Sequence, residues 1–129
     1  MMSKIALGTV QFGMDYGINS INGQVLPAEI KDILNYAYRQ NIDLLDTAPA
    51  YGNSEQVLGK CNSHEFKIVT KTRHFDCLEI GNREAQLLEN DFSQSLIDLK
   101  KDRVYGVLFH NANDLLKPGA EKLFKQLQE

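Results

Sequence analysis

The stretch IDLLDTAPAYGNSEQVLG, residues 42–59, decides the fold. It opens with a short apolar run of the length expected for a buried strand. A loop containing proline and glycine follows. Asn53 then stands where a helix N-cap is expected, with Gln56 three residues on, as in a capping box. We therefore expect a strand, a loop and a short helix that runs to about Leu58 and is ended by Gly59.

The same alternation of strand and helix recurs along the rest of the chain. Strand-like runs are expected at 5–9, 42–46, 66–71 and 104–109. Helical patterns run from Pro27 through Ala37, from Asn53 to Leu58, from Ala85 to Leu99, and from about Pro118 onward. Pro27 suits the first position of a helix, where its missing N–H has no partner to lose. Such alternation predicts a parallel sheet with right-handed crossovers.

Two finer expectations concern burial near the C-terminus. The run 104–109 is nearly all apolar, which predicts a strand buried on both faces. The last helix is expected to use Leu123, Phe124 and Leu127 as its core face.

A closed barrel and an open doubly wound sheet both fit a βαβαβαβα order. The open sheet often carries a GxGxxG turn or a Walker A loop after its first strand, and the first loop, LGTVQFG at 7–13, matches neither. A whole (β/α)8 barrel takes about 250 residues. We therefore expect an α/β fold of the (β/α)8 TIM-barrel type, with residues 1–129 supplying only its first four β/α units, a half barrel.

Composition excludes several classes of function. Hydrophobic residues make up 43% and charged residues 24%, close to the averages of folded domains, so disorder is not expected. The net charge of −3, without a run of Lys and Arg, argues against nucleic acid or an anionic membrane as partner. The apolar stretch interrupted by Gly8 is too short for a signal-peptide core or a membrane span, which favours a cytoplasmic protein. Cys61 and Cys77 form no CxxC and no metal-ligand spacing with the histidines, so reduced thiols and no metal are expected.

Titratable residues gather where the expected strands end. Asp46 ends the second strand and Tyr51 lies in the loop after it, Lys71 ends the third strand, and His110 follows the fourth. Carboxyl ends of parallel strands carry the reactive groups of β/α barrels. Taken singly, each residue has an ordinary explanation: a helix cap, a packing ring, a solvated ammonium and a histidine bonded to the backbone. Their joint placement on one rim favours a site.

The chemistry of this set is coherent. An ammonium beside a tyrosine hydroxyl stabilises the phenolate, so Lys71 would make Tyr51 a better proton donor. Asp46 would keep the charge on a partly buried Lys71. His110 could donate a hydrogen bond to a substrate oxygen. Together the four residues would protonate a carbonyl oxygen as it gains negative charge.

At these residues the sequence resembles the aldo-keto reductase family. The matching stretches are 7–9, 12–13, 46–55, 58–59, 68–71 and 108–110, and DTAPAYGNSE at 46–55 is the most specific of them. The resemblance implies a barrel that reduces an aldehyde or ketone, a small-molecule carbonyl substrate, with NADPH. It also maps the family's catalytic set onto Asp46, Tyr51, Lys71 and His110, with Tyr51 as the proton donor.

The resemblance further places Thr9, Val10 and Asp46 near the nicotinamide end of the cofactor. Phe12, Met14 and Tyr16 in the first loop would line the substrate pocket, the alternative for all three being ordinary loop packing.

The departure from the family is that units five to eight are missing, together with most of the family's cofactor contacts. The chain is therefore expected to be inactive alone. Three explanations fit the sequence equally: a truncated reading frame, a fragment of a longer enzyme, or half of an assembly of two chains. The alternative function is a non-catalytic half barrel that acts as an assembly module. In either case the open sheet edges predict self-association. The apolar inner face is expected to include Val107 and Phe109 or their neighbours.

Overall fold

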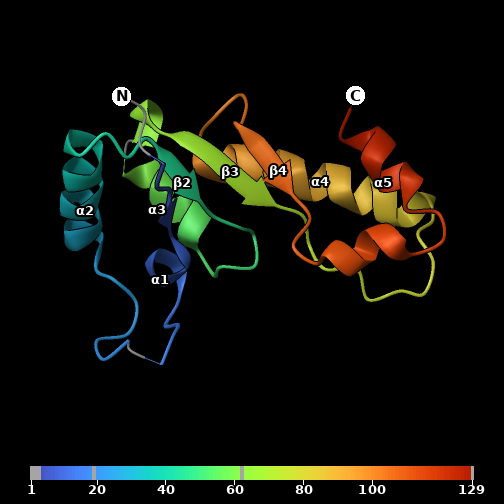
Figure 1. Cartoon of the computed structure of the whole chain (residues 1–129), viewed down its shortest axis with the longest axis horizontal. Coiled ribbons are helices and arrows are strands. Elements are labelled where there is room, and N and C mark those ends of the chain that lie inside the picture. Colours follow the sequence, from blue (N-terminus) through green and yellow to red (C-terminus); the bar gives the residue numbers. More distant parts are fainter. Residues whose placement is uncertain (1–3, 19, 62, 129) are drawn as a thin grey trace.

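A computed structural model describes residues 4–18, 20–61 and 63–128 of the chain. Its sheet has the strand order β1-β2-β3-β4, and every neighbouring pair is parallel. The strands are β1 (Leu7–Gly8), β2 (Leu44–Asp46), β3 (Lys67–Lys71) and β4 (Gly106–Leu108), shown in Figure 1. Strands that alternate with helices and stay in sequence order confirm the expected α/β architecture of consecutive β/α units.

Five α-helices and two short 3-10 helices connect the strands in the described ranges. They are α1 (Val10–Gly13), α2 (Pro27–Arg39), α3 (Ser54–Lys60), η1 (Ser63–Glu65), α4 (Asn82–Leu99), η2 (Ala112–Leu116) and α5 (Glu121–Gln126). Pro27 stands at the first helical position of α2, as expected. The single turn α1, inside the glycine-containing first loop, was not predicted. Within the same ranges, no helix is both long and apolar enough to cross a membrane.

The register of the sheet separates two faces. Leu45 pairs with Ile68, and both are buried in a core cluster that includes Leu34 of α2 and Leu58 of α3. Their neighbours along the strands alternate to the opposite face, because successive strand side chains point to opposite sides. Asp46 therefore belongs to the face away from these helices.

A second, smaller core cluster holds the C-terminal elements together. It consists of buried Phe75, Ile80, Leu88, Ala120 and Leu123. In Figure 1 the long helix α4 runs behind the sheet, and α5 packs beside it at the opposite end of the molecule from α2.

The structure corrects the burial expected near the C-terminus. Leu108 is 51% exposed, and Gly106 and Val107 are only half-buried, so the prediction that this strand is covered on both faces is wrong. The reason is that, among the residues the structure describes, β4 is an edge strand paired with β3 alone. Phe124 was also predicted for the core and is 56% exposed, whereas Leu123 beside it is fully buried.

The inner face was predicted to include Val107 and Phe109 or their neighbours, and the structure places the neighbour Leu108 there. Val107 pairs with Thr70, which is buried on the helix-facing side, so Val107 lies on that side too. Phe109, two residues on, packs partly buried against the second core cluster. Alternation instead leaves Leu108, the partner of Lys71, on the open face.

The turn chemistry predicted around α3 is also wrong in two details. Asn53 is the N-cap residue of α3, but its side chain makes no cap bond and instead accepts from Gln24 Nε2 at 2.9 Å. Gly59 lies inside the helix rather than ending it. A Cβ at Gly59 would lie 2.0 Å from the carbonyl oxygen of Asp98, so this glycine permits the close approach of α3 and α4.

Candidate active site

The carboxyl ends of β2, β3 and β4 form one rim of the sheet. Asp46 and Lys71 are the last residues of β2 and β3, and His110 follows β4 by two positions. Tyr51 lies in the loop between β2 and α3. Because the strands are parallel, these positions meet at the same edge, and the contacts among the four side chains confirm that they converge.

Lys71 is at the centre of the group. Its Nζ donates to Asp46 Oδ1 at 2.5 Å and to the carbonyl oxygen of Thr47 at 3.0 Å. The same nitrogen lies over the Tyr51 ring, 4.8 Å from its centroid. The Lys71 side chain is only 14% exposed, so these partners take the place of water around its Nζ. The ammonium is thus fixed between a carboxylate and an aromatic ring.

His110 completes the group from the last strand. Its ring meets the Tyr51 ring edge to face, with centroids 6.1 Å apart and planes at 72°. Its backbone N–H donates to the hydroxyl of buried Thr72 at 3.3 Å. Tyr51 therefore contacts an ammonium and an imidazole that come from two different strands.

Two glycines fix the loop that carries Tyr51 against the first loop. Gly52 has a φ of +58°, in the left-handed region that favours glycine. A Cβ at Gly13 would lie 1.7 Å from the carbonyl oxygen of Tyr51, and one at Gly52 would lie 2.2 Å from that of Gly13. The backbones touch directly, so the position of Tyr51 is set by the end of α1.

The expected substrate and cofactor residues of the first loop divide into two groups. Phe12 is buried in the main core cluster, so its ring packs and is not available to a ligand. Met14 and Tyr16 are 37% and 58% exposed. Thr9 is fully buried and its hydroxyl donates to the backbone oxygen of Asp46, whereas Val10, the first residue of α1, is half-buried.

Residues 4–129 of the chain match the family described as the Aldo/keto reductase family. This chain is a member of the aldo-keto reductase family. The family is one of NAD(P)H oxidoreductases. The match extends over nearly all of the sequence, so it includes all three strand ends that carry the candidate site.

Solved aldo-keto reductases show the same architecture over half their length. A Pseudomonas aeruginosa protein assigned to this family is 30% identical, with a TM-score of 0.78 over 98% of this chain and 50% of its own. A Bacillus halodurans aldo-keto reductase, solved in its holo form, has a TM-score of 0.67 at 17% identity, covering 98% and 41%. The latter likeness shows the fold alone. D-arabinose 1-dehydrogenase of Saccharomyces cerevisiae is 29% identical over 68 residues, 53% of this chain and 20% of that protein. The chain thus spans about half the length of these solved relatives.

Two charged features of the rim bear on the NAD(P)H that the family uses. Asp46 keeps a second carboxylate oxygen beyond the one bonded to Lys71, and its side chain is 34% exposed. The two cations at the end of β3, Lys71 and Arg73, are already in ion pairs with Asp46 and Asp91. Neither is free to hold a phosphate.

A buried carboxylate that the sequence did not reveal fixes the loop after His110. Asp114 of η2 is fully buried and accepts from the Phe75 N–H at 3.2 Å and from Lys117 Nζ at 2.7 Å. Burial acts to raise the pKa of Asp114, but the Lys117 ammonium and the Phe75 N–H outweigh it, and the net pKa lies below the usual value. This carboxylate ties the loop after β4 to the loop after β3.

Glu55, next to the Tyr51 loop, is a second buried carboxyl group that the sequence did not reveal. It is 5% exposed and accepts from Thr70 Oγ1 of β3 at 2.6 Å and from Ser95 Oγ of α4 at 2.9 Å. Burial raises the pKa of Glu55 by more than the hydrogen bonds from Thr70 and Ser95 lower it, and nearby Asp98 adds to the rise. The carboxyl therefore joins α3, β3 and α4 behind the site.

The raised pKa predicts how stability depends on pH. Below the ordinary glutamate pKa, about 4.3, Glu55 is protonated in both folded and unfolded chains. As the pH rises further, the unfolded chain loses the proton first, so stability falls until the raised folded pKa is passed. Glu55→Gln should remove this loss. Urea unfolding at pH 4 and pH 8 should show that the free energy of unfolding of the variant, relative to that of the wild type, is larger at pH 8 than at pH 4. An equal difference at both pH values would contradict the prediction.

Proposed function

We propose that this chain forms the acid–base half of an NADPH-dependent reductase of an aldehyde or ketone. The observation that carries the proposal is the position of Lys71, which bonds to Asp46 and lies over the ring of Tyr51 at the carboxyl ends of the strands. Residues 1–129 are then the N-terminal half of one (β/α)8 barrel. The cytoplasmic location expected from the sequence belongs to the same proposal, and the unpaired thiols of Cys61 and Cys77 support it.

The chain's own residues perform the proton chemistry. The Tyr51 hydroxyl donates its proton to the carbonyl oxygen of the substrate. Lys71 stabilises the phenolate that this leaves, and Asp46 holds the ammonium in place. His110, in edge contact with Tyr51, donates a hydrogen bond to the same substrate oxygen and sets its direction. The bound NADPH supplies the hydride.

The first loop supplies the contacts for substrate and cofactor on this side of the barrel. Exposed Met14 and Tyr16 are the candidates for the substrate pocket, while Phe12 supports them from the core. Val10 and Asp46 would lie at the nicotinamide. Thr9 is fully buried, with its hydroxyl and its N–H both bonded to the Asp46 carbonyl, so it would act there only by holding Asp46 in place. The remaining contacts with NADPH would come from the second half of the barrel.

A completed barrel tests the proposal directly. This chain would be joined to the second half of the Pseudomonas aeruginosa relative, whose first half it overlays with a TM-score of 0.78. The chimera should oxidise NADPH in the presence of a reactive aromatic aldehyde. The control is the same chimera carrying Lys71→Met, which removes the ammonium and keeps a side chain of similar length. Equal rates for the two proteins would refute the assignment of the site.

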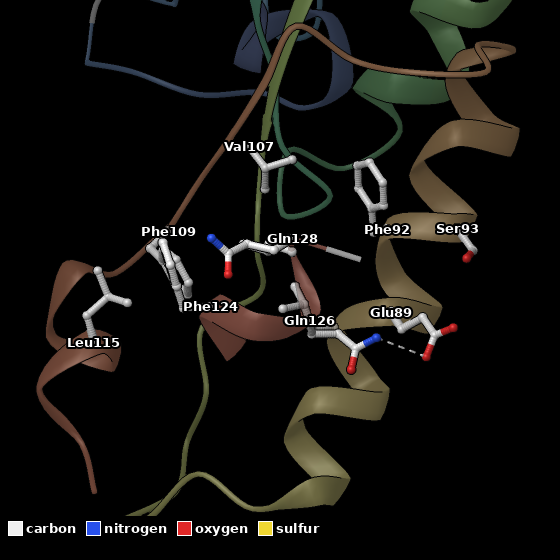
Figure 2. A pocket seen from close by; sticks show the side chains of 11 residues that line it. Glu89, Phe92, Ser93, Val107, Phe109, Leu115, Phe124, Gln126 and Gln128 are labelled. Atoms are coloured by element: carbon white, nitrogen blue, oxygen red, sulfur yellow. Dashed lines mark hydrogen bonds between the residues drawn. The ribbon is translucent and has the colours of Figure 1, made fainter. Parts of the chain in front are cut away.

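One feature favours the second candidate function, an assembly module. An apolar cavity of about 750 Å³ opens between α4, β4 and α5. Figure 2 shows Phe92, Val107, Phe109 and Phe124 around it. Exposed Leu108 lies on the same edge strand. An apolar surface beside an unpaired strand edge is typical of an interface.

This edge predicts self-association of the chain in isolation. Sedimentation velocity over a hundredfold concentration range should show dimers or larger species at the high end. Leu108→Lys should shift the distribution toward the monomer, because a charged side chain on an edge strand opposes edge pairing. Tyr36→Lys, at an exposed position on α2, is the matched control and should change nothing. A clean monomer at the highest concentration would rule out the assembly role.

A further inference from the structure

Three buried hydroxyls form a connected cluster directly beneath the rim. Ser54 Oγ lies 2.9 Å from Thr9 Oγ1 and 3.0 Å from the Thr9 carbonyl oxygen, with Thr47 Oγ1 at 3.1 Å. Thr9 Oγ1 in turn donates to the carbonyl oxygen of Asp46 at 2.9 Å. All three hydroxyl residues are fully buried. We refer to Thr9, Thr47 and Ser54 as the hydroxyl cluster.

The cluster joins three separate pieces of backbone. Thr9 follows β1, Thr47 follows β2, and Ser54 begins α3. The hydroxyls can donate in one direction, from Thr47 to Ser54 to Thr9 and then to the carbonyl of Asp46, so each proton has an acceptor. None of the three is left without a partner, which a buried hydroxyl requires.

Each end of the cluster leads to a residue of the candidate site. The Asp46 carbonyl receives both the hydroxyl and the N–H of Thr9, at 2.9 and 3.0 Å, which fixes the residue whose carboxylate binds Lys71. The carbonyl of Thr47 is the second acceptor of the Lys71 ammonium. The N–H of Ser54 donates to the carbonyl of Tyr51 at 3.1 Å.

We propose that the hydroxyl cluster is the positioning device of the proton-donating group: it holds Asp46, the Thr47 carbonyl and the Tyr51 loop in one arrangement around the Lys71 ammonium. These are positioning residues, because none of their hydroxyls contacts the reacting atoms. The proposal rests on the proposed function, since it assigns the cluster a task in that site. A hydrophobic contact could hold the three segments together, but it would not fix the direction of the Asp46 and Thr9 carbonyls, which accept from the hydroxyls.

The chemical reactivity of Lys71 reports on this arrangement, and its measurement needs neither cofactor nor turnover. An ammonium held by a carboxylate and a carbonyl has its N–H groups engaged and is a poor nucleophile. Lys67, on the same strand and paired with Asp43 at 2.8 Å, serves as an internal reference. The full chain would be treated with a limiting N-hydroxysuccinimide ester of acetic acid. Peptide mass spectrometry would give the ratio of acetylation at Lys71 to that at Lys67.

Three substitutions test the hydroxyls themselves. Ser54→Ala should raise the Lys71-to-Lys67 ratio about two- to tenfold, the usual scale of one lost hydrogen bond. Thr47→Val keeps the side-chain volume and removes the hydroxyl, whereas Thr47→Ser keeps the hydroxyl and removes the methyl. The valine variant should raise the ratio and the serine variant should leave it near the wild-type value.

The matched control separates positioning from general stability. Ser95→Ala also removes a buried hydroxyl, one that bonds to Glu55 on the far side of β3, and should lower the melting temperature without changing the ratio. An equal ratio for Ser54→Ala and Ser95→Ala would overturn the proposal, and so would a larger rise for Thr47→Ser than for Thr47→Val. If Thr47→Val does not fold, Ser54→Ala decides alone. The two experiments are independent. If the acetylation ratio does not respond, the chimera assay still tests the proposed function. If the chimera is inactive, the acetylation ratio still tests the positioning role of the hydroxyl cluster.

Discussion

The chain by itself should show no steady oxidation of NADPH with a reactive aldehyde. The completed chimera should turn over at a rate higher by several orders of magnitude. Hydride transfer needs the nicotinamide held against the substrate carbon, and such positioning can be worth about 7–11 kcal/mol of the barrier, or roughly 10⁵–10⁸ in rate. This chain spans 50% of the Pseudomonas aeruginosa relative, and under the proposed function the other half supplies most of that hold.

The structure adds a second reason for this expectation. Arg73, which stands near the rim, is already bonded to Asp91 and offers no free charge to a phosphate. Both Asp46 and Tyr51 are only half-buried in this chain, so water weakens the attraction of each for Lys71. The proton-donating group is thus assembled, but the chain alone holds the cofactor and substrate too weakly for the reaction.

The absorbance of NADPH, followed with purified chain and aldehyde, measures the effect. The no-protein rate is the baseline, and the chimera at equal concentration is the positive control. Steady oxidation by the chain alone that disappears in Tyr51→Phe would contradict the expectation. That outcome would point to a site rebuilt by association of two copies.

In the completed barrel, Tyr51→Phe should lower carbonyl reduction by roughly 10²–10⁴-fold, the usual scale for a positioned general acid. Phenylalanine keeps the ring under the Lys71 ammonium, 4.8 Å from its centroid, and keeps the edge contact with His110. Only the hydroxyl proton is lost. Binding of NADPH should change little, because the removed group acts on the substrate oxygen.

Steady-state kinetics and a fluorescence titration of NADPH separate these two effects. Tyr36→Phe is the matched control, since it removes a hydroxyl from an exposed tyrosine on α2, away from the rim. It should leave both quantities unchanged. Turnover within threefold of wild type for Tyr51→Phe would remove Tyr51 from the role of proton donor.

The sequence by itself determined the order and type of the principal elements. Apolar runs of strand length alternate with helical spacing, and this local signal needs no knowledge of distant contacts. The candidate site followed from one further step, because parallel strands bring their carboxyl ends to one edge. That step predicted from the sequence alone that Asp46, Lys71 and His110 lie on a common rim.

Only the tertiary structure decided what holds that rim together. Ser54 bonds to Thr9 across 45 positions of sequence, and Glu55 bonds to Ser95 across 40, so no local pattern could pair them. The same is true of Gly59, which looked like a helix terminator and instead admits the backbone of α4. The burial of the last strand was predicted incorrectly for a related reason. Composition reports how apolar a strand is, but only the sheet order shows that β4 is an edge with one neighbour. Local periodicity specifies elements, whereas hydroxyl pairing, backbone contact and edge exposure depend on which distant segments meet.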